Sequence, residues 1–264
     1  MIRLVALDID RTLLEPGVHH AAVPADDMTE AVHNLHEAGI VVALATGRMY
    51  PGTKFIAEHL QIDQPLICQQ GASVHEFDGQ LRHGCSIDPD IAVELYDYAT
   101  SHGWSLAWFD SFRYLVTEHS PQAQFFAEVS HVDMEIDAEP HNSGVVATGI
   151  DILSTIEHSK DVHVLLEARY GGRITLLDFP SVTAVHAPEA SKGNALKTLA
   201  EELGIERQDV LAVGDSVNDV SMLTWAGHSA APAHCDQYAK DSAKEILPGE
   251  GVSGVVQKLR SLLD

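Results

Sequence analysis

The sequence predicts an α/β protein in which a parallel sheet with helices on both faces carries an inserted α+β domain. Apolar runs such as residues 2–7 and 210–213 end directly in polar, mostly acidic residues, as buried strands do where an open sheet places its chemistry. Helical patterns separate these runs, and this β-α-β order implies parallel pairing through right-handed crossovers. From about residue 84 the pattern changes to closely spaced strands with few helices. We therefore expect a Rossmann-like core of residues 1–83 and 187–264, with residues 84–186 as a separate domain inserted into it.

The N-terminal half of the core alternates apolar runs with amphipathic stretches. A stripe at helical spacing that includes Met28 and Leu35 stops before Gly39, a natural helix end. The pair Asp78-Gly79 is typical of a hairpin turn. In chain order we expect a strand at 2–7, a turn-rich segment at 15–23, a helix at 24–38, a strand at 40–45, a helix at 51–60, a strand at 65–68 and a hairpin at 73–81.

The inserted region is rich in strand-like segments. We expect, in order, a helix at 89–102, strands at 104–109, 113–117 and 145–150, a helix at 152–159, and strands at 162–167, 173–178 and 183–187. Aromatic residues in or beside the first two strands are candidates for a substrate pocket, although aromatic residues in strands more often belong to the core. These candidates are Trp104, Trp108, Phe109, Phe112 and Tyr114.

The parallel pattern then resumes. Residues 191–203 form a predicted helix that stops at Gly204, and residues 210–213 form a very apolar short strand. The remaining predicted elements are a helix through Met222-Leu223, a strand at 228–231 and helices at 237–243 and 252–263.

The composition excludes several classes of partner. The chain has 264 residues, with 39 acidic against 16 basic residues and a formal net charge of −23, which disfavours binding to nucleic acid or to an anionic membrane surface. Three cysteines without a C-x-x-C pair fit a reducing compartment, so we expect a cytoplasmic protein. No signal sequence or membrane-spanning run is found, and we expect a monomer or small homo-oligomer.

Two acids follow the first strand. Asp8 and Asp10 lie on the same side of an extended segment, since side chains alternate along it. Carboxylates that close together need a cation or a shared proton between them. The pair is therefore either part of a Mg²⁺ ligand set or a nucleophile beside an acid/base.

Four groups of polar residues sit where predicted strands end or helices begin. Each has an ordinary structural reading by itself: Thr46 and Asn218 as capping residues, Lys192 as a solvated helix residue. Asp219, taken by itself, could be an ordinary acidic residue at the N-terminus of a helix. In order, the groups are Asp8, Asp10 and Thr12; Thr46 and Gly47; Lys192; and Asp215, Asn218 and Asp219.

These four groups together resemble the motifs of the haloacid dehalogenase-like (HAD) phosphatases. The first group stands in Asp8-Ile9-Asp10-Arg11-Thr12, and the last in Gly214-Asp215-Ser216-Val217-Asn218-Asp219. The last motif and the position of the insert resemble the Cof-type branch, whose insert is a large cap domain. The resemblance implies a Mg²⁺-dependent phosphoric monoester hydrolase that forms an aspartyl-phosphate. Its substrate would be a small phosphorylated metabolite: a sugar phosphate, a nucleotide or a cofactor phosphate.

The resemblance also implies roles for individual residues. Asp8 would be the nucleophile and Asp10 the general acid and base, while Gly214 would let the backbone turn tightly under the metal. The implied catalytic residues are Asp8, Asp10, Thr46 and Lys192; the implied substrate or phosphate contacts are Thr12, Thr46, Gly47, Arg48, Lys192 and Asn218; the implied metal ligands are Asp8, Asp10 through its main-chain carbonyl, Asp215 and Asp219.

The sequence departs from the family pattern at three places. Arg11 stands where glycine is usual, and would either contact substrate or point into solvent. Residues 230–234 lack the usual asparagine, and Gln69-Gln70-Gly71 replaces a more common Asn-Gly. Arg48 is either a phosphate contact or an exposed residue.

Two rival functions stay open: phosphoryl transfer within a sugar, as in phosphomannomutase-like relatives, and a non-catalytic binding protein on this fold.

Overall fold

Strand β1 (Leu4–Leu7) is an interior strand of a five-stranded parallel sheet of order β14-β13-β12-β1-β2. It pairs in register with β12 (Val210–Val213) on one side and β2 (Val41–Leu44) on the other. Because the three strands run the same way, their carboxyl ends meet at one edge of the sheet. The outer strands are β13 (His228–Pro232) and β14 (Glu245–Leu247).

Helices cover both faces of this sheet, which explains why all four residues of β1 are buried. The alternate residues Val5 and Leu7 pack on one layer of helices, and Leu4 and Ala6 pack on the other. The first layer contains α1 (Asp26–Glu37), α2 (Tyr50–His59) and α9 (Ser253–Arg260); the second contains α6 (Lys192–Glu202), α7 (Val220–Trp225) and α8 (Gln237–Ser242). The predicted parallel core is confirmed.

A small antiparallel sheet leads from the core to the insert. It consists of β3 (Leu66–Cys68), β4 (Ser73–His75) and β5 (Leu81–Gly84), and a bridge between Ala45 and Ile67 joins β3 to the end of β2. Short 3₁₀ helices occur at η1 (Gln69–Gly71), η2 (Pro140–Asn142), η3 (Arg207–Asp209) and η4 (Val217–Asp219).

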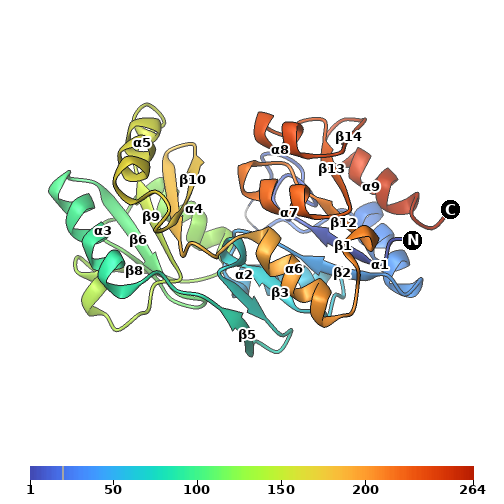
Figure 1. Ribbon diagram of the computed structural model, residues 1–264, viewed down its shortest axis with the longest axis horizontal. Coiled ribbons are helices and arrows are strands. Elements are labelled where there is room, and N and C mark those ends of the chain that lie inside the picture. Colours follow the sequence, from blue (N-terminus) through green and yellow to red (C-terminus); the bar gives the residue numbers. More distant parts are fainter. Residues whose placement is uncertain (20) are drawn as a thin grey trace.

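The insert is built on a second sheet of order β10-β11-β9-β6-β7-β8. Figure 1 shows the two sheets in separate halves of the molecule, each with its own helices. Helices α3 (Pro89–Ser101) and α5 (Ser159–Tyr170) pack on one face, and α4 (Pro121–Ser130) packs on the other. Its strands are β6 (Ser105–Phe109), β7 (Tyr114–Val116), β8 (Met134–Ile136), β9 (Gly149–Leu153), β10 (Thr175–Phe179) and β11 (Val182–His186). The predicted α+β cap is therefore present, and we propose residues 84–186 as its extent.

Two adjacent predictions in the cap are wrong. The helix expected at 152–159 is instead the end of β9, a turn and the first residue of α5, and the strand expected at 162–167 lies inside α5. In α5, Val162, Leu166 and Tyr170 recur every four residues and bury one side of the helix against the sheet. Branched residues in this stretch favour a strand prediction when only a short window is considered. The helical spacing of the apolar residues becomes apparent only over the full twelve residues of α5.

Helix α4 and strand β8 were not predicted, and the strand expected at 145–150 begins only at Gly149. The start of α4 carries a usable signal, because the Ser120 side chain accepts a hydrogen bond from the Ala123 N–H and proline follows it. Its small buried residues, such as Ala123 and Ala127, leave little hydrophobic periodicity to detect.

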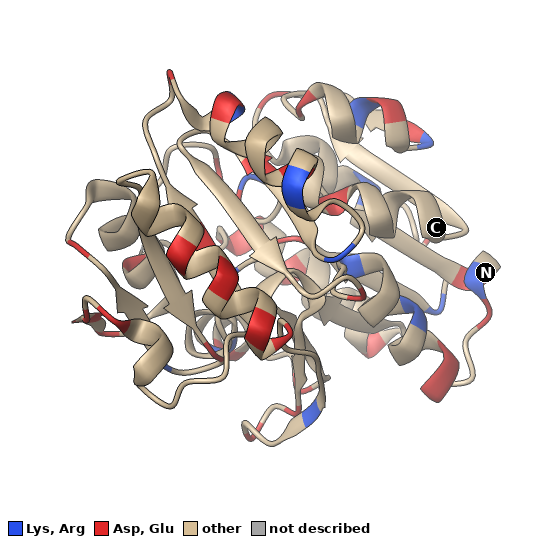
Figure 2. Cartoon of the chain, turned by 60° about the vertical axis from the view of Figure 1, so that its left-hand side comes forward, with Lys and Arg blue, Asp and Glu red and all other residues tan. Residues whose placement is uncertain are grey.

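The computed structural model describes residues 1–19 and 21–264; His20, in the turn-rich segment predicted at 15–23, lies outside the described residues. Acidic residues are scattered along the ribbon in both halves (Figure 2), and the sequence has more of them than basic residues. None of the helices in the described ranges has the length and apolar character needed to cross a membrane.

Candidate active site

Lys192 bridges two carboxylates at the carboxyl edge of the core sheet. It is the first residue of α6, and its Nζ donates to Asp8 Oδ1 at 2.7 Å and to Asp219 Oδ1 at 2.6 Å. Asp8 directly follows β1, and Asp219 follows β12 by six residues. All three side chains are buried. The fold thus brings together residues from both halves of the sequence around one ammonium group.

Asp215 completes a cluster of three buried acids. Carboxylate oxygens of Asp8, Asp215 and Asp219 lie within 4.8 Å of one another. Burial and the neighbouring acids raise the pKa of Asp8 well above its ordinary value, although Lys192 lowers it, and burial and Asp219 raise the pKa of Asp215 to about 7. Burial alone would lower the pKa of Lys192, but Asp219 and Asp8 raise it. Lys192, together with Arg11, which lowers the pKa of Asp215, therefore only partly balances the three acids.

The donor set fits a hard divalent cation. Asp215 Oδ2 is buried without a hydrogen-bond partner among the described residues. Carboxylate oxygens of this kind are the ligands that Mg²⁺ takes in proteins. The three acids could hold such an ion, which would also relieve their mutual repulsion.

Asp219 also shapes the loop that carries Asp215. Its Oδ2 accepts hydrogen bonds from the N–H groups of Asp215 at 2.9 Å and Ser216 at 3.0 Å. A Cβ at Gly214 would lie 2.3 Å from Asp219 Cγ. Glycine is needed there for this close approach, and not for the special backbone turn that we predicted, because Gly214 has no positive φ.

Arg48 holds the second aspartate of the first motif. Its Nε donates to Asp10 Oδ2 at 2.9 Å and its Nη2 to Asp10 Oδ1 at 2.5 Å. The Arg48 side chain is buried, so the alternative of an exposed arginine is wrong. The side chain of Asp10 is 47% exposed and forms part of a cavity wall. This two-bond geometry is specific to arginine.

Arg11 turns towards the acids and not into solvent. Its Nε lies 3.3 Å from Asp215 Oδ2, and its Nη2 donates to the His234 carbonyl at 3.0 Å. The backbone of Arg11 has φ 65°, in the left-handed region that favours glycine. The side chain is half-exposed and lines the cavity beside Asp215.

The two threonines lie behind the cavity wall. Thr12 and Thr46 are fully buried, and Thr12 Oγ1 has no partner within the described part of the chain. The Thr46 N–H donates to the Ile67 carbonyl at 2.9 Å, and its Oγ1 accepts from the Arg48 N–H at 3.2 Å. The Thr46 backbone N–H is therefore already used by the sheet.

Gln70 is a cavity residue that the sequence did not single out. Asn218 donates its amide to Gln70 Oε1 at 3.0 Å, whereas the resemblance implied a contact with substrate or phosphate. A Cβ at Gly47 would lie 2.4 Å from Gln70 Nε2. Gln70 has φ 59°. The Gln-Gln-Gly turn directly after a strand was the sequence feature from which this cavity residue could have been identified.

A cavity of about 700 Å³ separates this polar floor from the cap. Of the five aromatic candidates, Phe109 and Tyr114 line it. Trp108 packs on the opposite face of the cap sheet, and Phe112 is exposed against Tyr50. Cap residues in its wall that the sequence did not suggest include Phe125, Phe126, Phe179, Asp151 and His186.

Comparison with known proteins identifies relatives along the whole chain. A family model described as haloacid dehalogenase-like hydrolase matches residues 5–259. A 5-amino-6-(5-phospho-D-ribitylamino)uracil phosphatase of Bacillus subtilis is 25% identical, covering 99% of this chain and 98% of the relative. A phosphoglycolate phosphatase of Methanopyrus kandleri is 27% identical, and the match covers 100% of this chain and 98% of the relative. The solved structure of a Bacteroides thetaiotaomicron hydrolase of the same description superposes with TM-score 0.85 at 20% identity, covering 99% of this chain and 100% of that one.

Proposed function

Because the chain belongs to the haloacid dehalogenase-like hydrolases, in the Cof-type branch that its motifs resemble, we propose that it is a Mg²⁺-dependent phosphatase acting through an aspartyl-phosphate. It is a phosphoric monoester hydrolase of small phosphorylated metabolites, as its named relatives are phosphatases. The observation that carries the proposed mechanism is the buried cluster of Asp8, Asp215 and Asp219 around Lys192, at the floor of a cavity open to both domains.

Asp8 is the proposed nucleophile. One of its carboxylate oxygens forms a bond to phosphorus while the bond from phosphorus to the leaving oxygen breaks. Lys192, 2.7 Å from Asp8, orients this carboxylate and offsets part of the negative charge. Mg²⁺ held by Asp8, Asp215, Asp219 and the main-chain carbonyl of Asp10 would supply the remaining positive charge.

Asp10 is the proposed acid and base. It gives a proton to the leaving oxygen in the first step. In the second step it takes a proton from the water that attacks phosphorus, which releases phosphate and regenerates the Asp8 carboxylate. This role requires Asp10 to leave the two-bond pair with Arg48, and the freed guanidinium of Arg48 then binds phosphate oxygens.

Hydrolysis of p-nitrophenyl phosphate with Mg²⁺ tests the proposal. The wild type should release phosphate, and Asp8→Asn should lower kcat on the order of 10³-fold or more. Asp63→Asn, at an exposed position, serves as the matched control. A fully active Asp8→Asn protein would overturn the mechanism. If sugar phosphates isomerise without phosphate release, the phosphomutase alternative holds instead.

A further inference from the structure

The turn of Gln69, Gln70 and Gly71 has three successive residues with positive φ, at 50°, 59° and 89°. This left-handed region favours glycine, so the two glutamines are strained. Strain of this kind persists only where surrounding contacts hold the backbone in place. Gln69 is fully buried, and the contacts that hold the turn come from both the core and the cap.

On the core side, the turn binds the backbone of two residues of the candidate site. The Gln69 N–H donates to the Arg48 carbonyl at 2.9 Å. The Gln70 N–H donates to the Thr46 carbonyl at 3.0 Å, and the Gln70 side chain accepts the hydrogen bond from Asn218. The position of the turn therefore sets where Thr46 and Arg48 lie.

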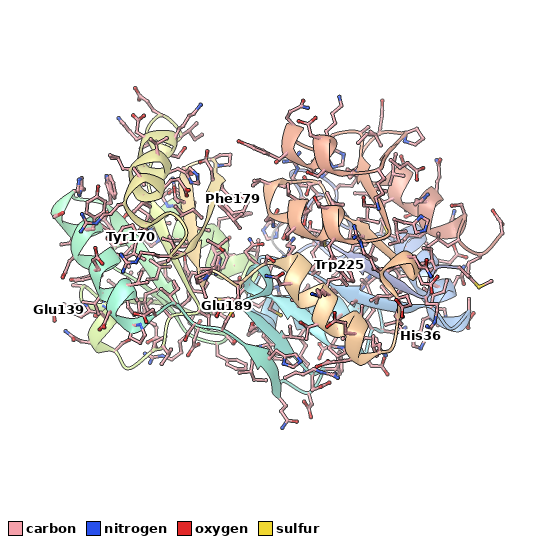
Figure 3. The ribbon with its side chains drawn as sticks, viewed as in Figure 1. His36, Glu139, Tyr170, Phe179, Glu189 and Trp225 are labelled. Carbon is pink, nitrogen blue, oxygen red and sulfur yellow. The ribbon has the colours of Figure 1, made fainter. Side chains whose placement is uncertain are left out.

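The turn also packs against the chain that leads into α6. A Cβ at Gly71 would lie 2.3 Å from the Ser191 carbonyl oxygen, so no larger residue fits there. Ser191 directly precedes Lys192 and caps its helix. Figure 3 labels Glu189, two residues before Ser191, between the two halves of the molecule. The turn thus contacts the second and fourth motifs and adjoins the lysine motif.

The side chain of Gln69 forms hydrogen bonds with the cap. Its Nε2 donates to the Asp110 carbonyl at 2.6 Å. Its Oε1 accepts from Ser111 Oγ at 3.3 Å and from Ser73 Oγ at 2.8 Å. Ser111 Oγ also lies 2.9 Å from His75 Nε2 of the core. One buried side chain therefore joins the strained turn to the cap loop between β6 and β7.

Asp110 fixes the shape of this cap loop. Its Oδ1 accepts hydrogen bonds from the N–H groups of Phe112 and Arg113, each at 2.8 Å. These bonds hold the loop in the form that presents the Asp110 carbonyl to Gln69. Gln69 and Asp110 both lie outside the cavity lining, so a kinetic effect of either residue must act through others.

Resting on the proposed phosphatase function, we infer that Gln69 is a positioning residue through which the cap loop of residues 110–113 supports the phosphate-binding end of the site. Without its side-chain bonds, the left-handed turn relaxes towards an ordinary backbone conformation. The carbonyls of Thr46 and Arg48 then move with the N–H groups that bind them. A misplacement of about 1 Å at such a distance from the chemistry can cost up to roughly 10²-fold in rate.

The variant Gln69→Leu tests the residue. Leucine fills the space but forms no hydrogen bond with the cap. We expect KM for p-nitrophenyl phosphate and Ki for inorganic phosphate as a competitive inhibitor each to rise roughly fivefold or more, because Thr46 and Arg48 are displaced. Neither constant depends on the fraction of enzyme that is folded, so a loss of stability alone does not give this result. Wild-type values of both constants would overturn the inference.

Two variants of Asp110 test the link with the cap. Asp110→Ala removes the acceptor that shapes the loop, so KM and Ki should rise as in Gln69→Leu. Asp110→Asn keeps an Oδ1 acceptor for the same N–H groups, and its constants should stay at the wild-type values. In the double variant Gln69→Leu/Asp110→Ala the two increases should not multiply, because both changes break the same contact.

The outcomes separate the link from the function on which it rests. Wild-type constants in Asp110→Ala, or increases that multiply in the double variant, would contradict the link through Gln69. Failure of the phosphatase function itself would appear differently, as a wild type without Mg²⁺-dependent hydrolysis of p-nitrophenyl phosphate.

Discussion

Arg48 and Asp10 form a two-bond ion pair in which a buried guanidinium holds the half-exposed carboxylate of the first motif. The two residues follow neighbouring parallel strands, β2 and β1, so the sheet itself sets their separation. In this structure the proposed acid/base and the proposed phosphate contact are therefore paired with each other.

The substitution Arg48→Lys should impair phosphate ester hydrolysis. Lysine keeps the charge but cannot form two parallel hydrogen bonds with a carboxylate or a phosphate. We expect kcat/KM for p-nitrophenyl phosphate to fall roughly tenfold to a hundredfold. Arg82→Lys is the control, because Arg82 pairs with Glu76 and Glu202 at the surface. Equal losses of kcat/KM in both variants would mean that the two parallel hydrogen bonds of the Arg48 guanidinium have no special role.

The substitution Gly214→Ala should disturb the acid cluster. The new Cβ would lie 2.3 Å from Asp219 Cγ, so Asp219 must move away from Lys192 or from the loop N–H groups. We expect the free energy of unfolding to fall by about 1–3 kcal/mol and the Mg²⁺ concentration for half-maximal activity to rise. Gly84→Ala is the comparison, because its Cβ meets the end of the flexible Leu81 side chain at 3.2 Å. Wild-type behaviour of Gly214→Ala would show that the cluster tolerates the methyl group.

Addition of Mg²⁺ should stabilise the folded protein. A ligand present at a hundred times its Kd adds about 2.7 kcal/mol to the free energy of unfolding. Denaturant titrations with and without EDTA measure this gain, which Asp215→Asn should remove. Asp241→Asn, at an exposed position of α8, should retain it. A wild type whose stability is the same with Mg²⁺ and with EDTA would argue against a metal at the acid cluster.

The stability of the protein should fall as the pH rises through the range in which Asp151 titrates. Burial raises the pKa of Asp151 to about 7, so between its ordinary value of 3.8 and pH 7 the native state binds a proton that the unfolded chain has lost. Asp151→Asn removes this dependence. The variant should gain roughly 2–3 kcal/mol on the wild type between pH 5 and pH 8.

Two other titratable groups share the wall with Asp151. His186, with a pKa lowered to about 4, has the opposite effect between pH 4 and pH 6.5, and Tyr114 has a raised pKa from burial and from the Asp151 charge. Both are present in wild type and variant, so the difference between the two proteins isolates Asp151. A difference that is the same at pH 5 and pH 8 would refute the prediction.

The core and its motifs were predictable because local patterns there match the final structure. The apolar run before Asp8 and the one before Asp215 are strands buried by helices on both sides. Parallel neighbours end at the same edge, so acids that follow each strand must meet. The start of α6 at Lys192 followed from a similar local signal, with the Ser191 side chain as its cap.

The residues that complete the site were not predictable from local patterns. Asp151 fell between a predicted strand and a predicted helix, because an acid in the middle of a buried strand contradicts the hydrophobic pattern. The pairing of Arg48 with Asp10 depends on the spacing of two strands, and that of Gln70 with Asn218 on contacts 148 residues apart. Such contacts are properties of the folded cavity, where tertiary packing overrides local preference.

The bridge from Lys192 to Asp8 spans 184 residues. Synthesis proceeds from the N-terminus, so the ribosome must complete the first strand and the entire cap before the lysine emerges. Until then Asp8 lacks its ammonium partner, and closing so long a loop carries an entropic cost that later contacts must offset. The cluster around Lys192 is consequently among the last parts of a newly made chain to assemble.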